Sequence, residues 1–285
     1  MTKTRHILGL SGGKDSAALA IHMNNKHPEI DVEYFFTDTG YELDETYKFL
    51  DKLKTRLDKP IHYIKPLNSF DYYMKKYNNF LPSPMSRWCT IEMKLKAMEK
   101  WLKPYLDAND EIITLVGIRY DERGRTGYKP THQAIKARFP FIEDFIDRDG
   151  VLQILEESGL GLPEYYKWRS RSGCTFCFFQ KKIEWVGLQE NNPSAWAHAK
   201  SLEKEATKKQ SSFYWISKDM PLTELEKPEV IAKIKEQHKK QLEKLKLKKN
   251  KKQENNPFLK GEKDLNIEEN LALDEVSSSC LVCHK

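Results

Sequence analysis

The chain has 285 residues, of which 39% are hydrophobic and 32% charged, so we expect one α/β domain with extensions or two small domains, partly solvated. The formal net charge of +6 is compatible with polyanionic partners without identifying one. No apolar run approaches the roughly 18 residues of a transmembrane helix, and no signal-peptide core precedes the first strand, so we expect a cytoplasmic protein without a membrane partner.

A glycine-rich turn follows the first apolar run. Residues 7–10 predict a buried parallel strand and residues 17–23 favour a helix, so the turn joins a strand to a helix. Two adjacent glycines allow a tight turn whose N–H groups can bind phosphate at the positive end of the helix. Hydroxyl groups, a cation and a carboxylate able to hold Mg²⁺ complete this expected site, made of Ser11, Gly12, Gly13, Lys14, Asp15 and Ser16.

Residues 32–36 predict a second strand, which ends in Asp38-Thr39-Gly40. Ligands of open parallel sheets collect at the carboxyl ends of the strands, so we expect Asp38 beside the phosphate loop. A helix over residues 43–57 follows, and Asp38 could also serve as its cap. A third short strand over residues 61–64 and a helix over residues 70–77 come next.

A loop broken by two prolines carries the segment Arg87-Trp88-Cys89-Thr90, and a helix with Lys94 and Lys96 follows it. A single cysteine is most often a small buried hydrophobic residue. Here Arg87 and the start of the helix favour the thiolate form, so we expect Cys89 to be a metal ligand or a redox group.

The clearest later strand covers residues 111–117 and runs into an arginine-rich loop. Planar guanidinium groups bind phosphate or sulfate oxygens in bidentate fashion, so we expect an anion site there. A solvated basic loop is the alternative. The residues concerned are Arg119, Glu122, Arg123 and Arg125.

Cys174 and Cys177 form a Cys-x-x-Cys pair directly after Gly173. Such a pair can present two thiolates to one metal but cannot fill a tetrahedral site. Cys89 would be a third ligand and Cys280 or Cys283 a fourth, which indicates a 4Fe–4S cluster, with zinc as the second choice.

The C-terminal third is rich in charge. Aromatic residues between positions 184 and 215 predict a small helical subdomain, although tryptophans could also stack on bases. Residues 233–252 contain ten lysines and two glutamates, which predicts a weakly amphipathic helix with a disordered far end at residues 248–256. This arm could bind nucleic acid such as tRNA or DNA, or be a solvated tail.

Five motifs in this order resemble those of the phosphoadenosine phosphosulfate (PAPS) reductase-like family in the PP-loop ATP pyrophosphatase superfamily. The resemblance covers about residues 5–180 and implies a doubly wound, mostly parallel, Rossmann-like α/β sheet with an adenine-nucleotide site. Arg123 and Arg125 flank the position at which the family has its later arginine. The motifs are Ser11-Gly-Gly-x-Asp-Ser16, Asp38-Thr-Gly40, Arg87-Trp-Cys-Thr90, Gly117-Ile-Arg119-x-x-Glu122 and Arg171-x-Gly-Cys174-x-x-Cys177.

The expected organisation is a nucleotide-binding domain over residues 1–180, a helical subdomain over residues 181–232 and a flexible charged tail over residues 233–285. The resemblance implies catalytic roles for Lys14, Asp15, Arg119 and Cys283. It implies nucleotide binding by the loop residues and by Asp38, Thr39, Gly40, Arg119, Glu122 and Arg123, and metal binding by Cys89, Cys174, Cys177 and Cys280.

The implied activity is sulfur chemistry on an adenylyl nucleotide. In a reductase, a cysteine thiolate attacks the sulfur of adenylyl sulfate, and a thiol reductant protein completes the cycle. In an ATP pyrophosphatase, ATP is cleaved between its α- and β-phosphates to adenylate tRNA or DNA, which then accepts sulfur. A third alternative is a nucleotide-sensing or phage-defence component that binds nucleic acid without turnover.

Overall fold

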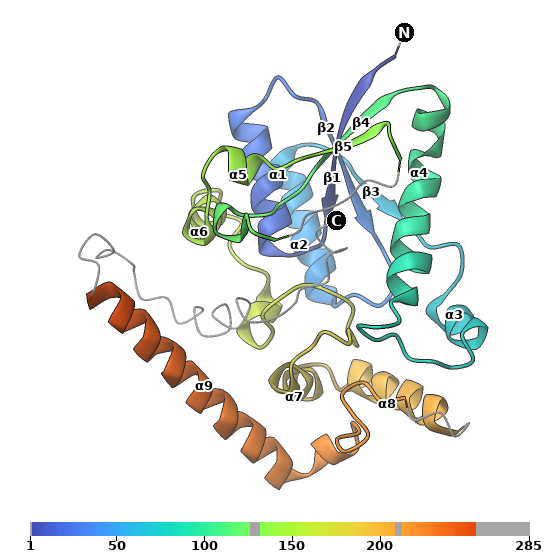
Figure 1. The fold of residues 1–285 in the computed structure, drawn as a ribbon, viewed down its shortest axis with the longest axis vertical. Coiled ribbons are helices and arrows are strands. Elements are labelled where there is room, and N and C mark those ends of the chain that lie inside the picture. The colour runs from blue at the N-terminus through green and yellow to red at the C-terminus, as the bar shows by residue number, and fades with distance from the viewer. Residues whose placement is uncertain (1, 126–131, 209–212, 255–285) are drawn as a thin grey trace.

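The computed structural model describes the backbone of residues 2–125, 132–208 and 213–254, with side chains throughout except at 205–208, 245, 246 and 248–254 (Figure 1). The strands are β1 (Thr4–Leu10), β2 (Val32–Thr37), β3 (Ile61–Ile64), β4 (Glu111–Leu115) and β5 (Ile135–Arg138). The helices are α1 (Lys14–Lys26), α2 (Asp44–Leu57), α3 (Phe70–Lys76), α4 (Lys96–Asp107), α5 (Pro140–Glu143), α6 (Arg148–Glu157), α7 (Lys182–Asn191), α8 (Pro193–Lys208) and α9 (Pro228–Glu254). A π-helical turn, Thr90–Leu95, precedes α4, and 3₁₀ turns lie at Tyr120–Glu122, Glu164–Lys167 and Glu224–Glu226.

The five strands form one all-parallel sheet in the order β3-β2-β1-β4-β5. His6 of β1 lies opposite Val32 of β2 on one side and Ile113 of β4 on the other. The chain therefore builds outward from β1 to β3, then returns to β1 and builds the other way. The expected doubly wound parallel α/β fold is confirmed, and its switch point lies between β1 and β4.

Helices cover both faces of the sheet, as Figure 1 shows. Leu8 and Leu10 pack with α1, α2 and α6, whereas Ile7 packs with α4 on the other face. Alternate residues of a strand point to opposite faces, so a strand buried on both faces is apolar throughout. This is why residues 7–10 form an uninterrupted apolar run apart from Gly9.

Helices α7 and α8 and the start of α9 share a core with residues from the first half of the chain, at the lower end of the molecule in Figure 1. Trp185, Trp196 and Trp215 are buried there together with Phe70 and Trp88 from the first half of the chain. These tryptophans pack the core and are not base-stacking platforms, because their rings are almost fully covered.

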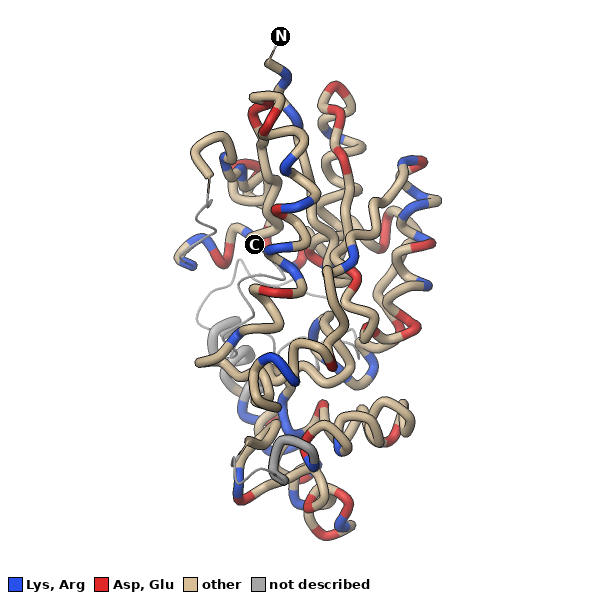
Figure 2. The backbone as a smooth tube through the Cα atoms, turned by 90° about the vertical axis from the view of Figure 1, so that its right-hand side faces the viewer, with Lys and Arg blue, Asp and Glu red and all other residues tan. Residues whose placement is uncertain are grey.

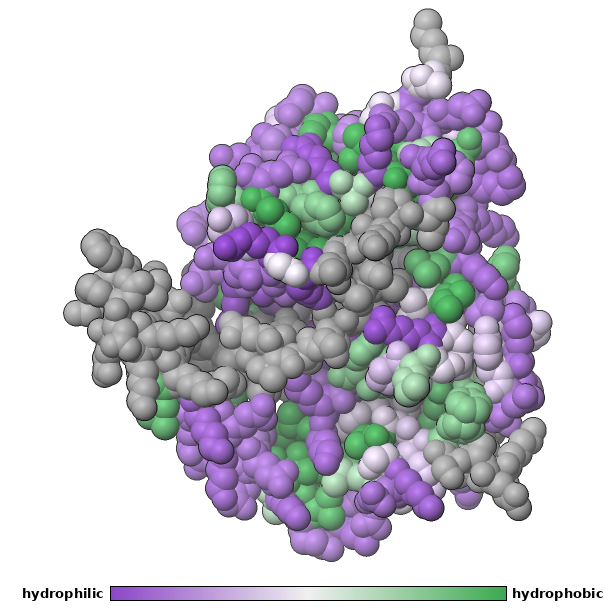
Figure 3. All heavy atoms as spheres, in the orientation of Figure 1, coloured by the Kyte–Doolittle hydropathy of each residue, from purple (hydrophilic) through white to green (hydrophobic). Residues whose placement is uncertain are grey.

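Hydrophilic residues dominate the face seen in Figure 3, with smaller hydrophobic patches between them.

Helix α9 differs from the expectation in two respects. It begins at Pro228 and runs across the expected boundary at 232/233, with Ile234 and Leu242 buried and Lys235 paired with Glu190 of α7 at 2.7 Å. It also continues to Glu254, so the expectation of disorder from residue 248 is wrong as far as residue 254. Lysine, glutamine and glutamate are good helix formers, which outweighs the repulsion between like charges here.

Charges of both signs are interspersed along the described chain on the side seen in Figure 2. Lysines and arginines alternate there with acidic residues along the same elements. Within residues 2–125, 132–208 and 213–254, no helix has both the length and the apolar character that crossing a membrane requires.

Candidate active site

The phosphate loop, residues 11–16, connects the carboxyl end of β1 to the start of α1. Gly12 has φ +72°, and a Cβ there would lie 2.4 Å from Thr46 Cγ2, so backbone conformation and space both require glycine. The hydroxyl groups of Ser11 and Ser16 lie 3.1 Å apart, and Ser172 donates to the Ser11 hydroxyl over 3.2 Å. The segment that carries the Cys-x-x-Cys pair therefore touches the phosphate loop directly.

Two adjacent tyrosines support the loop from the side of the 3₁₀ turn Glu164–Lys167. Tyr165 donates its hydroxyl hydrogen to the Gly12 carbonyl at 2.7 Å, and the Lys14 N–H donates to Tyr166 Oη at 3.3 Å. Burial raises the pKa of Tyr165 well above its ordinary value, so this phenol remains a hydrogen-bond donor. The loop conformation thus depends on residues about 150 positions later in the chain.

A buried group of three charges lies at the start of α1. Asp15 Oδ2 accepts from Lys14 Nζ and its Oδ1 accepts from Arg119 Nη1, each at 3.0 Å. Burial acts to lower the pKa of Arg119, but the carboxylates of Asp15 and Asp121 outweigh it and raise that pKa. With Asp121, which Arg119 also contacts, these charges balance, so the attraction of the loop for an anion rests on its N–H groups and on the positive end of α1.

The other arginines of the expected anion loop make different contacts. The Arg123 guanidinium lies over the Tyr120 ring, 4.4 Å from its centroid, and Arg125 donates to Glu122 Oε1 at 2.6 Å. Glu122 also approaches Arg119, with 3.5 Å between its Oε1 and Arg119 Nη2. Arg119 is thus the arginine placed at the phosphate loop, while nucleotide binding by Arg123 stays a prediction.

The end of β2 connects the loop to the cysteines. Asp38 accepts from the Gly40 N–H at 2.9 Å and from the Tyr47 hydroxyl at 2.7 Å, so its carboxylate organises its own turn. Burial and the Asp38 carboxylate both raise the pKa of Tyr47. Thr39 donates to Glu42 Oε1 at 3.0 Å, and its Oγ1 lies 3.3 Å from Cys174 Sγ.

Two adjoining pockets lie at this edge of the sheet. The first is open at the carboxyl ends of β1 and β2 and is lined by Gly9, Leu10, Ser11, Phe35, Phe36, Thr37, Glu42, Lys94, Leu95 and Met98. The second, which we call the thiol pocket, has mostly apolar walls and is lined by Thr39, Tyr41, Phe70, Pro82, Cys89, Thr90, Met93, Lys94, Gly173, Cys174, Phe176, Cys177, Phe178 and Phe179. Lys94 lines both pockets, so they share a wall.

The thiol pocket brings Cys89 together with Cys174 and Cys177, which lie 85 or more positions later in the sequence. Arg169 is fully buried and donates to the carbonyls of Gly173 and Cys174 at 3.1 and 2.9 Å, which fixes the turn between the two later cysteines. Burial, reinforced by the nearby Glu42 carboxylate, raises the pKa of Cys174 well above its ordinary value. Cys280 and Cys283 lie outside the described residues.

A comparison with known families matches the first half of the chain. Residues 5–144 match the model of the phosphoadenosine phosphosulfate reductase domain, and they include the phosphate loop, Asp38, Cys89 and Arg119. Residues 5–144 of the chain form a domain of the PAPS reductase-like family. The expected family is thereby confirmed, and the Cys-x-x-Cys pair lies beyond the matched residues.

Relatives of this PAPS reductase-like chain include two uncharacterized proteins of Methanocaldococcus jannaschii, 26% and 28% identical over 220 and 195 residues. The alignments cover 75% and 64% of this chain but 45% and 44% of those proteins, so the chain spans about half their length. An uncharacterized 37.8 kDa protein of Escherichia phage 186 is 24% identical, with 64% of this chain and 69% of that protein covered.

Two solved structures resemble the PAPS reductase-like chain more distantly. The PAPS reductase of Candida auris in a phosphate complex has a TM-score of 0.47 and 17% identity, covering 61% of this chain and 82% of that one. The U34-tRNA thiolase NcsA of Methanococcus maripaludis, solved with its 4Fe–4S cluster, has a TM-score of 0.39 and 16% identity, covering 71% and 72%.

Sequence reasoning missed several residues that shape this PAPS reductase-like site. Glu42 lies between Thr39 and Cys174, and Ser172 reaches the phosphate loop. Tyr165 and Tyr166 hold the loop backbone. The sequence offered a partial signal, because Ser172 directly precedes Gly173-Cys174, whereas nothing local to Glu42 indicates its contacts.

The π-helical turn Thr90–Leu95 is held by its buried Glu92, which accepts from Lys96 at 2.8 Å and from Lys76 and the Tyr77 hydroxyl at 2.9 Å. These contacts tie the turn that carries Lys94 to α3. Lys96 and Lys76 lower the pKa of Glu92 to about 2, and Lys96 has the larger effect. An isolated glutamate titrates near 4.5, so Glu92 stabilises the fold above that pH, and the contribution disappears as the pH falls toward 2.

We expect Glu92→Gln to lower the free energy of unfolding at pH 7 by about 1–2 kcal/mol. This value lies between those typical of exposed and of buried ion pairs, because Glu92 is buried and its two lysine partners are half exposed. Urea unfolding at pH 7 and pH 3.5 measures this, and the deficit should shrink at the lower pH. Glu190→Gln, in an exposed pair with Lys235, is the control and should change little. An equal deficit at both pH values would contradict the assignment.

Proposed function

We propose that the protein binds an adenylyl nucleotide at its phosphate loop and carries out sulfur chemistry beside it. One observation carries the proposal: the phosphate loop and the thiol pocket are joined by direct contacts. Ser172 connects the Cys-x-x-Cys segment to Ser11, and Thr39 at the end of β2 contacts Cys174. A reactive phosphate and a group of thiols would thus be neighbours.

The nucleotide would occupy the open pocket at the carboxyl ends of β1 and β2. Phosphate oxygens would face the N–H groups and hydroxyls of the loop, and Lys14 and Arg119 would supply positive charge. Asp15 would hold these two side chains in place. Both oxygens of Asp15 are already paired with cations, so Asp15 does not fit a Mg²⁺ ion in this arrangement, and Mg²⁺ arriving with ATP stays a prediction.

We propose a 4Fe–4S cluster rather than zinc for the thiol pocket. Cys89, Cys174 and Cys177 offer soft thiolate ligands in an apolar surrounding, which suits iron–sulfur chemistry. A tetrahedral zinc with sulfurs at about 2.3 Å needs them only about 3.8 Å apart. These three sulfurs do not all lie within 4.8 Å of one another. A bound cluster would supply a site for a sulfur atom, with Cys280 predicted as the fourth ligand.

The residues of the loop would stabilise the charge that develops on the leaving group. With ATP, the bond between the α- and β-phosphates breaks and pyrophosphate leaves, facing Lys14, Arg119 and the loop N–H groups. With adenylyl sulfate, a cysteine thiolate forms a bond to sulfur while the sulfur–oxygen bond to AMP breaks. The second reaction requires a nucleophile such as Cys283, which lies outside the described residues.

We favour the ATP reaction, because the three thiols of the pocket are already gathered without the tail. The adenylated acceptor would be tRNA or DNA, and the lysine-rich segment of residues 233–252 would help to bind its phosphates. The thiol pocket and this lysine-rich segment support the choice of the ATP reaction.

The test is to incubate anaerobically purified protein with ATP, and separately with adenylyl sulfate or its 3′-phosphorylated form plus a thiol reductant. We expect pyrophosphate and AMP from ATP, more of both when tRNA or DNA is added, and none with Lys14→Ala. Sulfite from an adenylyl sulfate would support the reductase instead. If neither product forms with any substrate, the proposed catalysis is wrong and a binding role is favoured.

A further inference from the structure

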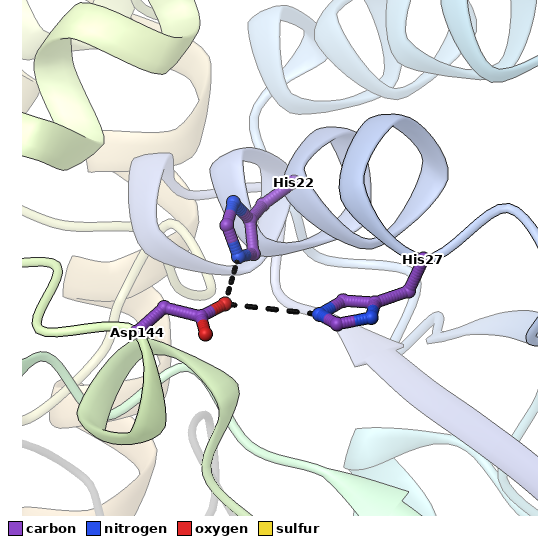
Figure 4. Close-up of side chains that lie close together, drawn as sticks. All are labelled: His22, His27 and Asp144. Atoms are coloured by element: carbon purple, nitrogen blue, oxygen red, sulfur yellow. Dashed lines mark hydrogen bonds and ion pairs between the residues drawn. The ribbon is translucent and has the colours of Figure 1, made fainter.

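A second group of potential metal ligands lies at the end of α1 that is remote from the phosphate loop (Figure 4). His22 is on α1, His27 directly follows it, and Asp144 directly follows α5. Asp144 Oδ2 lies 2.5 Å from His22 Nε2 and 3.8 Å from His27 Nε2. One ligand atom from each residue thus lies within 4.8 Å of the other two.

The surroundings suit a metal ligand set. The His22 side chain is only 6% exposed and His27 24%, so the imidazoles are largely withdrawn from water. The second nitrogen of His27, Nδ1, lies 3.4 Å from Glu29 Oε1. A carboxylate on the nitrogen opposite the metal is the usual means by which proteins orient a metal-binding histidine.

A simple ion pair explains only part of this arrangement. One carboxylate needs one imidazolium to be neutralised, yet two imidazoles approach the same oxygen of Asp144. The two rings also lie close to each other, with 6.1 Å between the ring centroids of His22 and His27. A divalent cation between them would bind both imidazoles and the carboxylate at once.

We propose that His22, His27 and Asp144 form a zinc site, in which a water molecule completes the tetrahedron. Zinc binds histidine nitrogen and carboxylate oxygen at about 2.0–2.1 Å, which places ligand atoms about 3.3 Å apart. The contacts of 2.5 and 3.8 Å bracket this spacing, so small side-chain movements would admit the ion. The ion would brace α5 against the helix whose first turn carries Lys14 and Asp15.

The experiment uses Co²⁺ as a spectroscopic probe of the full chain, because thiols and nitrogen ligands then give different spectra. The wild-type protein should bind one equivalent of Co²⁺ more than the His27→Gln variant. The difference spectrum should show ligand-field bands without sulfur-to-cobalt charge transfer, since no sulfur belongs to this site. His62→Gln, at an exposed histidine on β3, is the control and should bind as wild type does.

Two further variants keep the test decisive. Glu29→Gln should weaken Co²⁺ binding by about 10- to 100-fold, the usual loss when a partner of a ligating histidine is removed. If circular dichroism shows that His27→Gln is unfolded, Asp144→Asn takes its place as the ligand variant. Equal stoichiometry and spectra in wild type and the ligand variants would overturn the site. This readout is metal binding, so it is independent of the proposed sulfur chemistry.

Discussion

A Cys174→Ser variant should lose the proposed 4Fe–4S cluster and, with it, the proposed sulfur chemistry. We expect roughly four iron atoms per chain in the wild type and at least about a tenfold drop in iron and sulfide in the variant, because a hydroxyl is a poor ligand for iron of this kind. Cys174 is central to the thiol pocket, where its sulfur lies 3.3 Å from Thr39 Oγ1 and 3.6 Å from Glu42 Oε1. Anaerobic purification followed by iron, sulfide and zinc analysis measures the effect.

Thr175→Ser provides the matched control for Cys174→Ser, since it changes the same turn without removing a thiol, and it should retain its iron. Cys280→Ser, prepared in parallel, tests whether the tail supplies the fourth ligand. Full iron content in Cys174→Ser would show that the cluster is held elsewhere. A colourless wild-type protein that contains zinc would indicate that the thiol pocket binds zinc and not a cluster.

Arg119→Lys should lower the rate of pyrophosphate release by about 100- to 1,000-fold, the typical cost of removing one charge-stabilising donor. The Arg119 fork reaches Asp15 with one nitrogen and Asp121 with the others, which a single ammonium group cannot reproduce. Asp15 would keep Lys14 but lose its second partner, so the position of both cations at the phosphates would change.

Steady-state kinetics with saturating ATP measures the effect of Arg119→Lys on turnover, and a thermal melt confirms that the variant is folded. Arg56→Lys is the control, because Arg56 is exposed on α2, where its Nε donates to the Ser158 carbonyl at 3.2 Å. A folded Arg119→Lys enzyme that retains most of its activity would remove Arg119 from the leaving-group site.

Much of the fold could be predicted from the sequence, because central strands of a parallel sheet are continuous apolar runs and the phosphate loop has a distinctive composition. Strand β5 could not be predicted in this way. Its sequence, Ile-Lys-Ala-Arg, contains one buried residue, Ile135, and among the described strands it pairs with β4 alone, at the edge of the sheet. Without burial on both faces, such a strand has no hydrophobic pattern.

The candidate site shows the same division between local and distant information. The Cys-x-x-Cys pair and the phosphate loop are local motifs, and their spacing alone indicated phosphate and metal chemistry. The contacts of Glu42 with Thr39 and Cys174, and of Tyr165 with Gly12, connect segments that only folding brings together. No hydrophobic periodicity within a single segment predicts these contacts.

The position of β1 in the middle of the sheet has a consequence for biosynthesis. β1 leaves the ribosome before the other strands of the sheet and meets β2 soon afterwards, but Thr4 pairs with Glu111, 107 residues later. At about 5–20 residues per second, translation of that interval takes roughly 5 to 20 seconds. For that time the nascent chain has one unpaired edge of an apolar strand, which is an opportunity for chaperone binding and a risk of aggregation.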